Sequence, residues 1–517
     1  MKNVKIVFAS LLLTMSLVSC NASEPEQKEY DYKNLSCDVL PTYSASMNLD
    51  TDNDLITGTV DISVNNQSGE SLNDIVFIDY ARGLNRRGGI NTIKYNDQDL
   101  EFSFNGSIYT VDLTSSPIKA GETRVFSLNF NTYPTSSSKE SYCTVYARDN
   151  GEKEYALGYF MPQLAYHHND EWYNKQYNND TEAACYPMAD FEVDFFVDDS
   201  YTLMSTGRDN KINGGYHISA PSIREMNIYC SNFCDIYEKE MDGIRYRVNV
   251  DDDESQQEVY HLMLDVAHEA ITKFEDLCGE YIYDELDVVL LRDMTFASGV
   301  EYPGLIYSQK IIVNDAGASF ISYGGYNYPM PYIEIFDTIA HEVGHQYFYN
   351  IMGTSSLDDG WIDEGFASYL GSVEFLLNPS EILKKYAQID KENAKIYTSF
   401  QYNLAVYCYD PNNPEEYMND YVYYTDASFG MMAIDVPYDK NNSNYFELIY
   451  DIASSFITKI AITLGRDEFK SLMHDIYTNY SKREITTYNM IELIKTHDIN
   501  NSTDDLLETY LANHINN

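Results

Sequence analysis

Positive charge is scarce in this chain of 517 residues. It carries 34 lysines and arginines against 81 aspartates and glutamates, which gives a formal net charge of −47 at pH 7. A surface this acidic repels phosphate groups, so the composition excludes a nucleic acid partner held through its backbone and offers no electrostatic attraction to anionic lipid. Tryptophan is nearly absent, with 2 residues against 48 tyrosines, but this bias identifies no partner.

Cysteine is also sparse, and its spacing is informative. None of the 8 cysteines forms a CxxC pair, the spacing typical of thiolate zinc sites and of redox-active disulfides. We therefore interpret the cysteines downstream of the N-terminus as structural residues.

Long hydrophobic runs are missing outside the N-terminus. Lys2 and Lys5 precede an apolar segment at residues 6–18, whereas a membrane-spanning helix needs about 20 apolar residues. A basic start followed by a short apolar core is typical of an export signal. The segment ends in LVSC at residues 17–20, which resembles the bacterial lipobox, whose cysteine is lipidated and becomes the mature N-terminus.

The N-terminus thus predicts a signal peptide over residues 1–19 and a tether over residues 20–31, with the lipid on Cys20. We expect an exported protein that this lipid anchors to a bacterial membrane, at the cell surface or facing the periplasm. A plain secretory signal, with a cysteine at that position by chance, is the alternative.

Hydrophobic periodicity divides the remaining chain in two. Residues 32–250 alternate apolar and polar side chains, as at Val60, Ile62 and Val64, and turn residues separate these stretches, which predicts an antiparallel β domain. Over residues 251–517 the period changes to that of α-helices. The expected fold class is a multidomain α+β protein, with an N-terminal β domain followed by a mainly α-helical domain.

The same pattern places individual elements of the second domain. Residues 386–445 are rich in tyrosine, asparagine and aspartate and show little periodicity, so we expect a long loop with short helices there. Helices are predicted over residues 259–277, 334–351, 364–377, 451–464 and 467–480, and strands over residues 286–291 and 306–313.

One predicted helix carries a motif with metal-ligand spacing. His341 and His345 belong to the sequence HEVGH, and at 100° per residue they lie about 40° apart on one face and one turn apart. Both imidazoles can then reach one metal ion, and Glu342 can reach a water on that metal. An ordinary helix face that happens to carry these residues is the alternative.

A glutamate on the next predicted helix completes the pattern. Eighteen residues separate His345 from Glu364, and a second helix antiparallel to the first can present Glu364 as a third ligand. Two histidines, one glutamate and one open position are the arrangement of catalytic zinc, whereas structural zinc takes four protein ligands. The sequence therefore predicts one catalytic Zn²⁺ per chain.

These motifs resemble a known family. The stretches HEVGHQYFYN and GWIDEGFASY around the three ligands are similar to the gluzincin aminopeptidases of the aminopeptidase N type. The sequence SGVEYP at residues 298–303 resembles the family's G-x-M-E-N box, and Tyr450 ahead of LGRDEF resembles its catalytic-tyrosine helix. Residues 159–172 and 189–207 resemble the end of its N-terminal domain.

The resemblance implies a fold and a set of roles. It implies a saddle-shaped N-terminal β domain and a thermolysin-like catalytic domain. His341, His345 and Glu364 would bind Zn²⁺, Glu342 would be the general base for the zinc-activated water, and Tyr450 would donate a hydrogen bond to the oxyanion. Tyr445 and Tyr438 are alternative candidates for that tyrosine.

It also implies a site for the substrate's N-terminus. Glu301 would bind the free α-ammonium of the peptide, with Gly299 of the same box beside it and Gln163 contributing from the β domain. A solvated strand end for Glu301 and a packing role for Gln163 are the alternatives. Many family members carry a second carboxylate at the position of Gly371, and its absence puts the orientation of a ligating histidine in question.

Together these features predict a zinc-dependent aminopeptidase that hydrolyses N-terminal residues from peptides with a free N-terminus. A zinc hydrolase or endopeptidase with other substrates is one alternative. A non-catalytic surface protein that binds peptides on a gluzincin body is the other.

Overall fold

The computed structural model describes residues 36–85, 87–136, 142–176, 185–251, 256–292, 294, 297–323, 326–397 and 414–515. The predicted signal peptide, tether and Cys20 lie outside these residues. Within the described ranges, no helix has both the length and the apolar character needed to cross a membrane.

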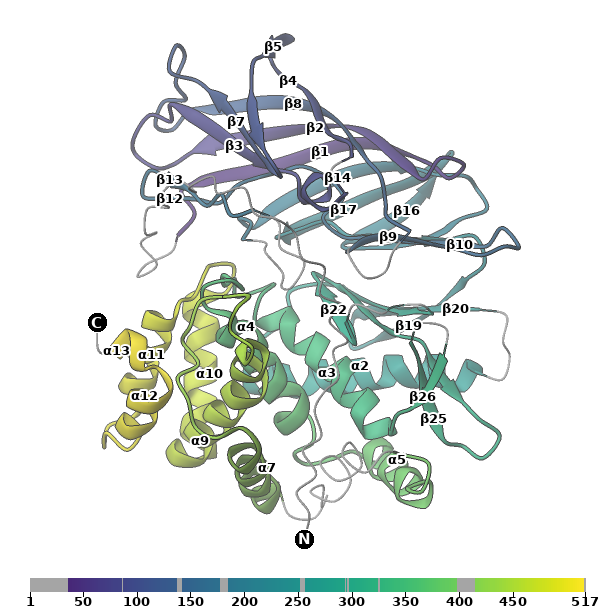
Figure 1. Cartoon of the computed structure of the whole chain (residues 1–517), viewed down its shortest axis with the longest axis vertical. Coiled ribbons are helices and arrows are strands. Elements are labelled where there is room, and N and C mark those ends of the chain that lie inside the picture. The colour runs from purple at the N-terminus through teal and green to yellow at the C-terminus, as the bar shows by residue number, and fades with distance from the viewer. Residues whose placement is uncertain are drawn as a thin grey trace.

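The N-terminal domain is built on a large twisted sheet, drawn in purple and blue in Figure 1. Its long first strand alternates buried and exposed side chains without interruption, and Tyr43 stacks on Phe191 of the neighbouring strand at 4.1 Å between ring centroids. Period-two burial is what a sheet with one covered face requires. In sheet order the strands are β16 (Arg208–Ile212), β17 (Gly215–Ile223), β14 (Ala189–Phe196), β1 (Val39–Asp50), β2 (Leu55–Asn66), β8 (Thr123–Thr132), β4 (Gly89–Tyr95) and β5 (Gln98–Leu100).

Two four-stranded sheets share the hydrophobic core of this domain. One has the order β15 (Thr202–Ser205), β18 (Ile228–Ser231), β10 (Lys153–Leu157), β9 (Cys143–Ala147). The other has the order β11 (Gln163–Leu164), β3 (Asp74–Ile78), β7 (Ile108–Asp112), β6 (Ser103–Asn105). The smaller elements are α1 (Tyr80–Asn85), β12 (His167–His168) and β13 (Glu171–Trp172). The prediction of an N-terminal domain of mainly antiparallel strands is confirmed.

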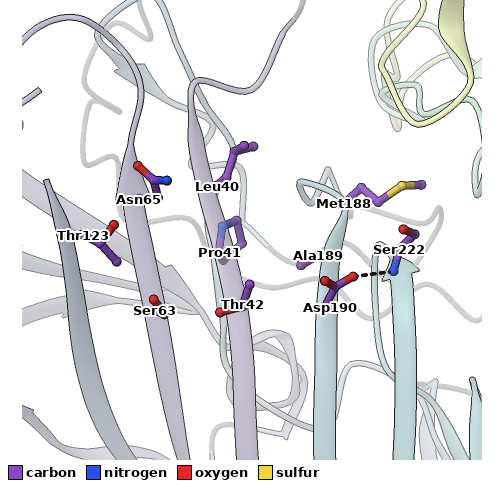
Figure 2. Close-up of a pocket in the computed structure, with 10 residues that line it drawn as sticks. All are labelled: Leu40, Pro41, Thr42, Ser63, Asn65, Thr123, Met188, Ala189, Asp190 and Ser222. Atoms are coloured by element: carbon purple, nitrogen blue, oxygen red, sulfur yellow. Dashed lines mark hydrogen bonds between the residues drawn. The ribbon is translucent and has the colours of Figure 1, made fainter. Parts of the chain in front are cut away.

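Figure 2 shows an open hollow at one end of the large sheet, lined by residues of β1, β2 and β14. Asp190 is its only charged lining residue, and its carboxylate accepts a hydrogen bond from the backbone N–H of Ser222 at 2.9 Å. The hollow contains none of the predicted site residues.

The second domain begins earlier than the periodicity suggested. Strands β19 (Asp235–Met241) and β20 (Ile244–Val250) join β21 (Glu285–Leu291), β23 (Leu305–Gln309) and β22 (Gly299–Tyr302) in one five-stranded sheet. Sheet continuity thus assigns β19 and β20 to the second domain, and the boundary at residue 250 is displaced. An alternating pattern of apolar and polar side chains predicts that a segment is a strand, but it does not indicate which sheet the strand joins.

Most predicted helices are present, together with one that was missed. Residues 386–445 are predicted to form a long loop with short helices, whereas α7 (Pro414–Phe429) is a 16-residue helix there. Its buried positions include Tyr417 and Tyr421, so tyrosine supplies the apolar stripe that aliphatic residues usually mark. The helices are α2 (Gln257–Leu277), α3 (Tyr332–Tyr347), α4 (Gly360–Tyr369), α5 (Glu381–Glu392), α7, α8 (Tyr445–Glu447), α9 (Ala453–Leu464), α10 (Arg466–Tyr480), α11 (Thr487–His497), α12 (Asp504–Tyr510) and α13 (Ala512–Ile515).

Two π-helical turns interrupt these helices beside the predicted site. The turn η3 (Leu370–Glu374) continues α4, and the turn η5 (Leu448–Ile452) precedes α9. Single π-turns inside helices occur frequently at functional sites because they shift side chains out of the regular register. The predicted strand over residues 306–313 is also divided, into β23 and β24 (Ile311–Val313), and β25 (Ser319–Tyr323) and β26 (Tyr326–Pro329) complete a three-stranded sheet with β24.

Close packing of α3 on α4 positions the site. A Cβ atom on Gly344 would lie 3.0 Å from Cα of Ala367, so these two helices approach each other through their smallest residues. The start of α3 is held separately, because Asp390 of α5 accepts hydrogen bonds from the backbone N–H groups of Tyr332 and Ile333 at 2.9 and 3.0 Å. Such bonds satisfy the unpaired donors of a helix N-terminus.

A buried arginine joins the two domains. Arg224, which follows β17, donates to Glu484 at 2.7 Å and to the backbone oxygen of Asn350 at 2.9 Å. Tyr166 of the β domain donates to the other oxygen of Glu484 at 2.6 Å. Because Asn350 lies directly after α3, this network fixes the β domain against the end of the helix that carries both histidines.

Candidate metal centre and active site

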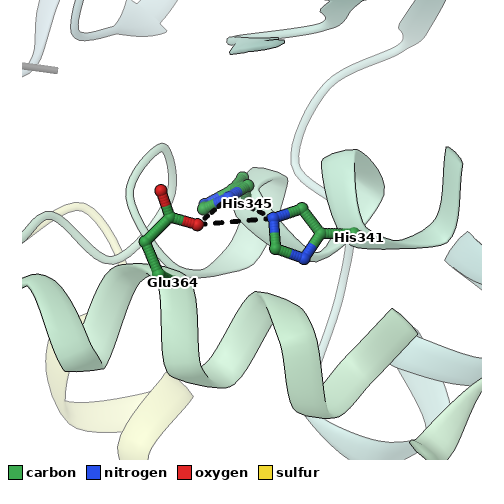
Figure 3. Close-up of side chains that lie close together, drawn as sticks. All are labelled: His341, His345 and Glu364. Atoms are coloured by element: carbon green, nitrogen blue, oxygen red, sulfur yellow. Dashed lines mark hydrogen bonds and ion pairs between the residues drawn. The ribbon is translucent and has the colours of Figure 1, made fainter. Parts of the chain in front are cut away.

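Three potential metal ligands converge between α3 and α4. Nε2 of His341 and Nε2 of His345 lie 3.1 Å apart, and Oε2 of Glu364 lies 3.4 and 3.2 Å from them. Figure 3 shows one carboxylate oxygen of Glu364 directed at both imidazoles. The structure thus brings together the three residues that the sequence predicted as ligands, across the contact of two helices.

The spacing of these atoms fits zinc. Ligand atoms about 2.0–2.1 Å from a tetrahedral ion lie roughly 3.3 Å from one another, close to the three distances observed. Burial lowers the pKa of His341, which favours the neutral imidazole that coordinates a metal. Two nitrogens and one carboxylate leave a fourth position for water or substrate.

Asp363 contacts one of the three candidate ligands, His345, and this residue was not predicted from the sequence. Its Oδ1 lies 2.8 Å from Nδ1 of His345, and its Oδ2 accepts a hydrogen bond from the Ser356 hydroxyl at 2.6 Å. A carboxylate on Nδ1 fixes the tautomer and ring orientation of a ligating histidine. The sequence did contain one signal for this role, because Asp363 is a carboxylate directly before the predicted ligand Glu364.

The electrostatic surroundings favour positive charge at this centre. Burial by itself lowers the pKa of His345, but the carboxylates of Glu301, Glu364 and Asp363 outweigh it and raise that pKa well above its ordinary value. The same buried carboxylates would stabilise a divalent cation in place of the proton.

Gly371 lacks the carboxylate that many similar proteins carry there, and Asp337 occupies the space. A Cβ atom on Gly371 would lie 2.9 Å from Oδ1 of Asp337. Asp337 accepts a hydrogen bond from the Ser372 hydroxyl at 2.9 Å. The neighbour of Nδ1 of His341 is instead the Ser368 hydroxyl, at 3.5 Å, a longer contact than the one Asp363 makes with His345.

Glu342 and Gly299 are in contact. Glu342 is buried on α3, one residue after the first ligand, and a Cβ atom on Gly299 would lie 2.1 Å from its Oε1. Edge strand β22 therefore passes Glu342 so closely that only glycine leaves room for the carboxylate. Gly299 was predicted as a substrate-binding residue, and the structure shows an additional reason for a glycine at this position.

Glu301 lies on the same edge strand and approaches His345 on the side of its Nδ1. It is 4% exposed, and its Oε1 lies 4.0 Å from Nδ1 of His345. This burial does not fit the alternative of a solvated strand end. Burial of a carboxylate is costly unless a cation or a set of donors compensates it.

Of the three candidate tyrosines, Tyr450 contacts the ligand set. It lies in η5, donates a hydrogen bond to Oε1 of Glu364, and stacks on His341 at 5.9 Å between ring centroids. Tyr445 instead donates to the backbone oxygen of Ser356 at 3.2 Å, and Tyr438 packs edge-on against Tyr445.

Gln163 is occupied within the protein. It is buried in β11, and its Nε2 donates to the backbone oxygen of Arg224 at 2.9 Å. These contacts are those of a packing residue, and its contribution to substrate binding stays a prediction.

A second acidic group among the described residues is already neutralised. Asp209, Glu285 and Asp287 also have oxygens within 4.8 Å of one another. Arg247 lies among them, with its Nη2 at 2.6 Å from both Glu285 and Asp287. This group is a buried ion-pair network that joins β16 to the five-stranded sheet.

The comparisons with known proteins agree with this geometry. Residues 262–510 match the family model described as Peptidase family M1 domain. A 97-residue stretch is 35% identical to Aminopeptidase N of Rattus norvegicus, and this match covers 19% of the chain but only 9% of that relative.

Solved structures show the same fold over most of the chain. A variant of an M1 zinc metallopeptidase from Deinococcus radiodurans aligns with a TM-score of 0.58 at 14% identity, covering 91% of this chain and 94% of that one. The same enzyme bound to a Tyr-Ser-Ala substrate aligns with a TM-score of 0.57 at 13% identity, covering 91% and 93%.

The β domain, the helical domain and the histidine–histidine–glutamate centre define a two-domain metallopeptidase fold of the gluzincin type. More specifically, residues 262–510, just under half of the chain, match a Peptidase family M1 domain, and the resemblance to aminopeptidase N-type gluzincins is confirmed.

We expect the purified protein to bind one Zn²⁺ per chain. His345→Ala and Glu364→Ala should each lose stoichiometric zinc, because two ligands no longer close a tetrahedral site. Glu342→Gln is the matched control and should keep its zinc, since Glu342 is not a ligand. Elemental analysis after dialysis measures this, and full zinc occupancy in His345→Ala would contradict the assignment.

Proposed function

We propose that this protein is a zinc-dependent aminopeptidase that removes N-terminal residues from peptides. The observation that carries the proposal is the placement of two further buried carboxylates, Glu342 and Glu301, beside the three-ligand centre. The M1 metallopeptidase that binds Tyr-Ser-Ala supports a peptide substrate.

Zinc, when bound by His341, His345 and Glu364, supplies a Lewis acid that polarises the scissile carbonyl and lowers the pKa of water. Glu342 is placed to accept the proton of the attacking water and to pass it to the leaving amine. Its carboxylate is confined between α3 and the edge strand at Gly299, so it holds one orientation.

Tyr450 supplies the hydrogen bond to the oxygen that becomes negative during attack. Its hydroxyl donates to Glu364 in this structure, which places it beside the ligand set before substrate arrives. Loss of a comparable oxyanion donor costs about 3–4 kcal/mol of transition-state stabilisation.

Glu301 accounts for the preference for a free N-terminus. A substrate ammonium would gain a favourable charge interaction with this buried carboxylate, and an internal peptide segment carries no such cation. An endopeptidase has no use for such a group, and a non-catalytic binding protein has no use for Glu342. Both alternatives are therefore less well supported than the aminopeptidase.

Aminoacyl-anilides, free and N-acetylated, test the activity. We expect hydrolysis of the free substrates only, with loss of activity in chelator and a fall in kcat of at least about 10²-fold in Glu342→Gln, the lower end of what general-base catalysis contributes. Glu301→Gln should raise KM for free substrates more than it lowers kcat. Equal cleavage of acetylated substrates would contradict the proposal.

Gly299→Ala tests the close approach of β22 to Glu342. The added methyl group overlaps the carboxylate, so we expect a loss of about 10²-fold in kcat, the effect of displacing a catalytic group by about 1 Å. Zinc content should stay at one per chain, since the atoms nearest the added methyl group belong to Glu342, which is not a predicted ligand. Ser298→Ala is the control at the preceding residue, whose side chain is exposed. Unchanged kcat in Gly299→Ala would contradict the steric argument.

We further propose that the protein is exported and anchored by a lipid on Cys20. The basic residues, short apolar segment and LVSC sequence at the N-terminus support this. A labelled fatty acid supplied during bacterial expression should be incorporated into the wild-type protein and found with the membrane fraction. Cys20→Ser should lose the label, and label retained in Cys20→Ser would contradict lipidation at this residue.

A further inference from the structure

A series of hydrogen bonds leads from the β domain toward His345 through the Ser355–Asp359 turn, the segment that precedes α4. One step in this series is covalent, the peptide bond between Ser355 and Ser356. The candidate site described above uses only the end nearest His345, which is Ser356 and Asp363.

The first link joins the two domains by charge. Nζ of Lys175, in the segment after β13, lies 2.5 and 2.6 Å from the two carboxylate oxygens of Asp358. The Tyr173 hydroxyl lies 2.9 Å from the Ser355 hydroxyl and 3.3 Å from Asp358. The Asp358 side chain is 14% exposed, so water can compensate little of its charge if Lys175 is removed.

The second link closes the turn itself. The Ser355 hydroxyl donates to Asp358 at 2.7 Å, and the backbone N–H groups of Asp358 and Asp359 both donate to the Ser355 backbone oxygen, at 3.0 and 2.7 Å. Ser356 lies inside this closed turn, so its position follows from the contacts of its neighbours.

The third link reaches the metal ligand. Asp363 is fully buried, with one oxygen on Nδ1 of His345 and the other accepting from the Ser356 hydroxyl. These two contacts fix the plane of the carboxylate. Without the Ser356 hydroxyl, Asp363 can rotate and no longer holds the imidazole of His345 in one orientation.

We propose that Lys175, Tyr173 and Ser356 are positioning residues for the zinc centre, through which the β domain sets the zinc affinity of the catalytic domain. This inference rests on the proposed zinc site and goes beyond it, because it makes ligand geometry depend on contacts from a separate domain. The partners of metal ligands influence affinity because they orient the ligand before the metal arrives.

Zinc affinity of the apo protein, measured by competition with a chromophoric chelator, tests the proposal. We expect Ser356→Ala to weaken zinc binding by about 10-fold or more, as other losses of such partners do, and Ser356→Thr to restore it. Lys175→Met should weaken binding in the same direction, up to about 10-fold. The matched control is Lys153→Met, because Lys153 pairs with Asp54 at 2.8 Å inside the β domain and has a similar exposure, 22% against 25% for Lys175.

The double variant separates positioning from general destabilisation. If Lys175 acts through Ser356, then Ser356→Ala/Lys175→Met should bind zinc no more weakly than Ser356→Ala alone. Independent structural damage would instead multiply the two effects. Should Lys175→Met fail to fold, Tyr173→Phe removes a single hydroxyl from the same link and should weaken zinc binding relative to wild type.

Three results would overturn the inference. They are wild-type zinc affinity in Lys175→Met, an equal loss in Lys153→Met, and multiplied losses in the double variant. In each case zinc binding by the wild type leaves the proposed function standing. A wild-type protein that binds no zinc would overturn the proposed function and, with it, this inference.

Discussion

The structure depends on the convergence of three ligand atoms in a buried space. Two imidazole nitrogens and a carboxylate oxygen lie within 3.4 Å of one another, and such a group is stable in a protein interior only with a positive charge at its centre. Two features of the surrounding structure meet this requirement. The glycine-mediated contact of α3 and α4 brings the atoms together, and the surrounding carboxylates set the charge.

The same constraint explains why the buried carboxylates around the centre differ in their surroundings. Asp363 has both oxygens engaged by protein groups, as expected of a residue that orients a ligand. Glu342 is confined by the glycine of the edge strand, as expected of a base that must hold one orientation. Glu301 lies 4.0 Å from Nδ1 of His345, on the side of the imidazole that Asp363 also contacts. Three carboxylates of the same chemistry thus acquire three roles from their contacts.

The β domain contributes to the site without supplying a ligand. Arg224 fixes it against the end of α3, and Lys175 fixes it against the turn before α4. Arg224 pairs with Glu484 and donates to the backbone oxygen of Asn350, three residues after α3, and Lys175 pairs with Asp358, two residues before α4. The contacts of the β domain thus lie next to the ends of the two helices that carry the predicted ligands.

The sequence by itself predicted the ligand candidates, the candidate base and the order of the two domains. Helical spacing places His341 and His345 on one face whatever surrounds them, and an alternating pattern marks strands whatever sheet they enter. Only the tertiary structure showed the contact of Asp363 with His345, the contact of Gly299 with Glu342, the hydrogen bond of Tyr450 to Glu364, and the sheet that β19 and β20 join. The physical reason is that these depend on which segments meet in space, and neither a local period nor a local spacing records a contact between residues far apart in the chain. The length of helix α7 was not predicted for a related reason. Its buried positions are tyrosines, and composition alone does not distinguish a tyrosine-rich helix from a loop.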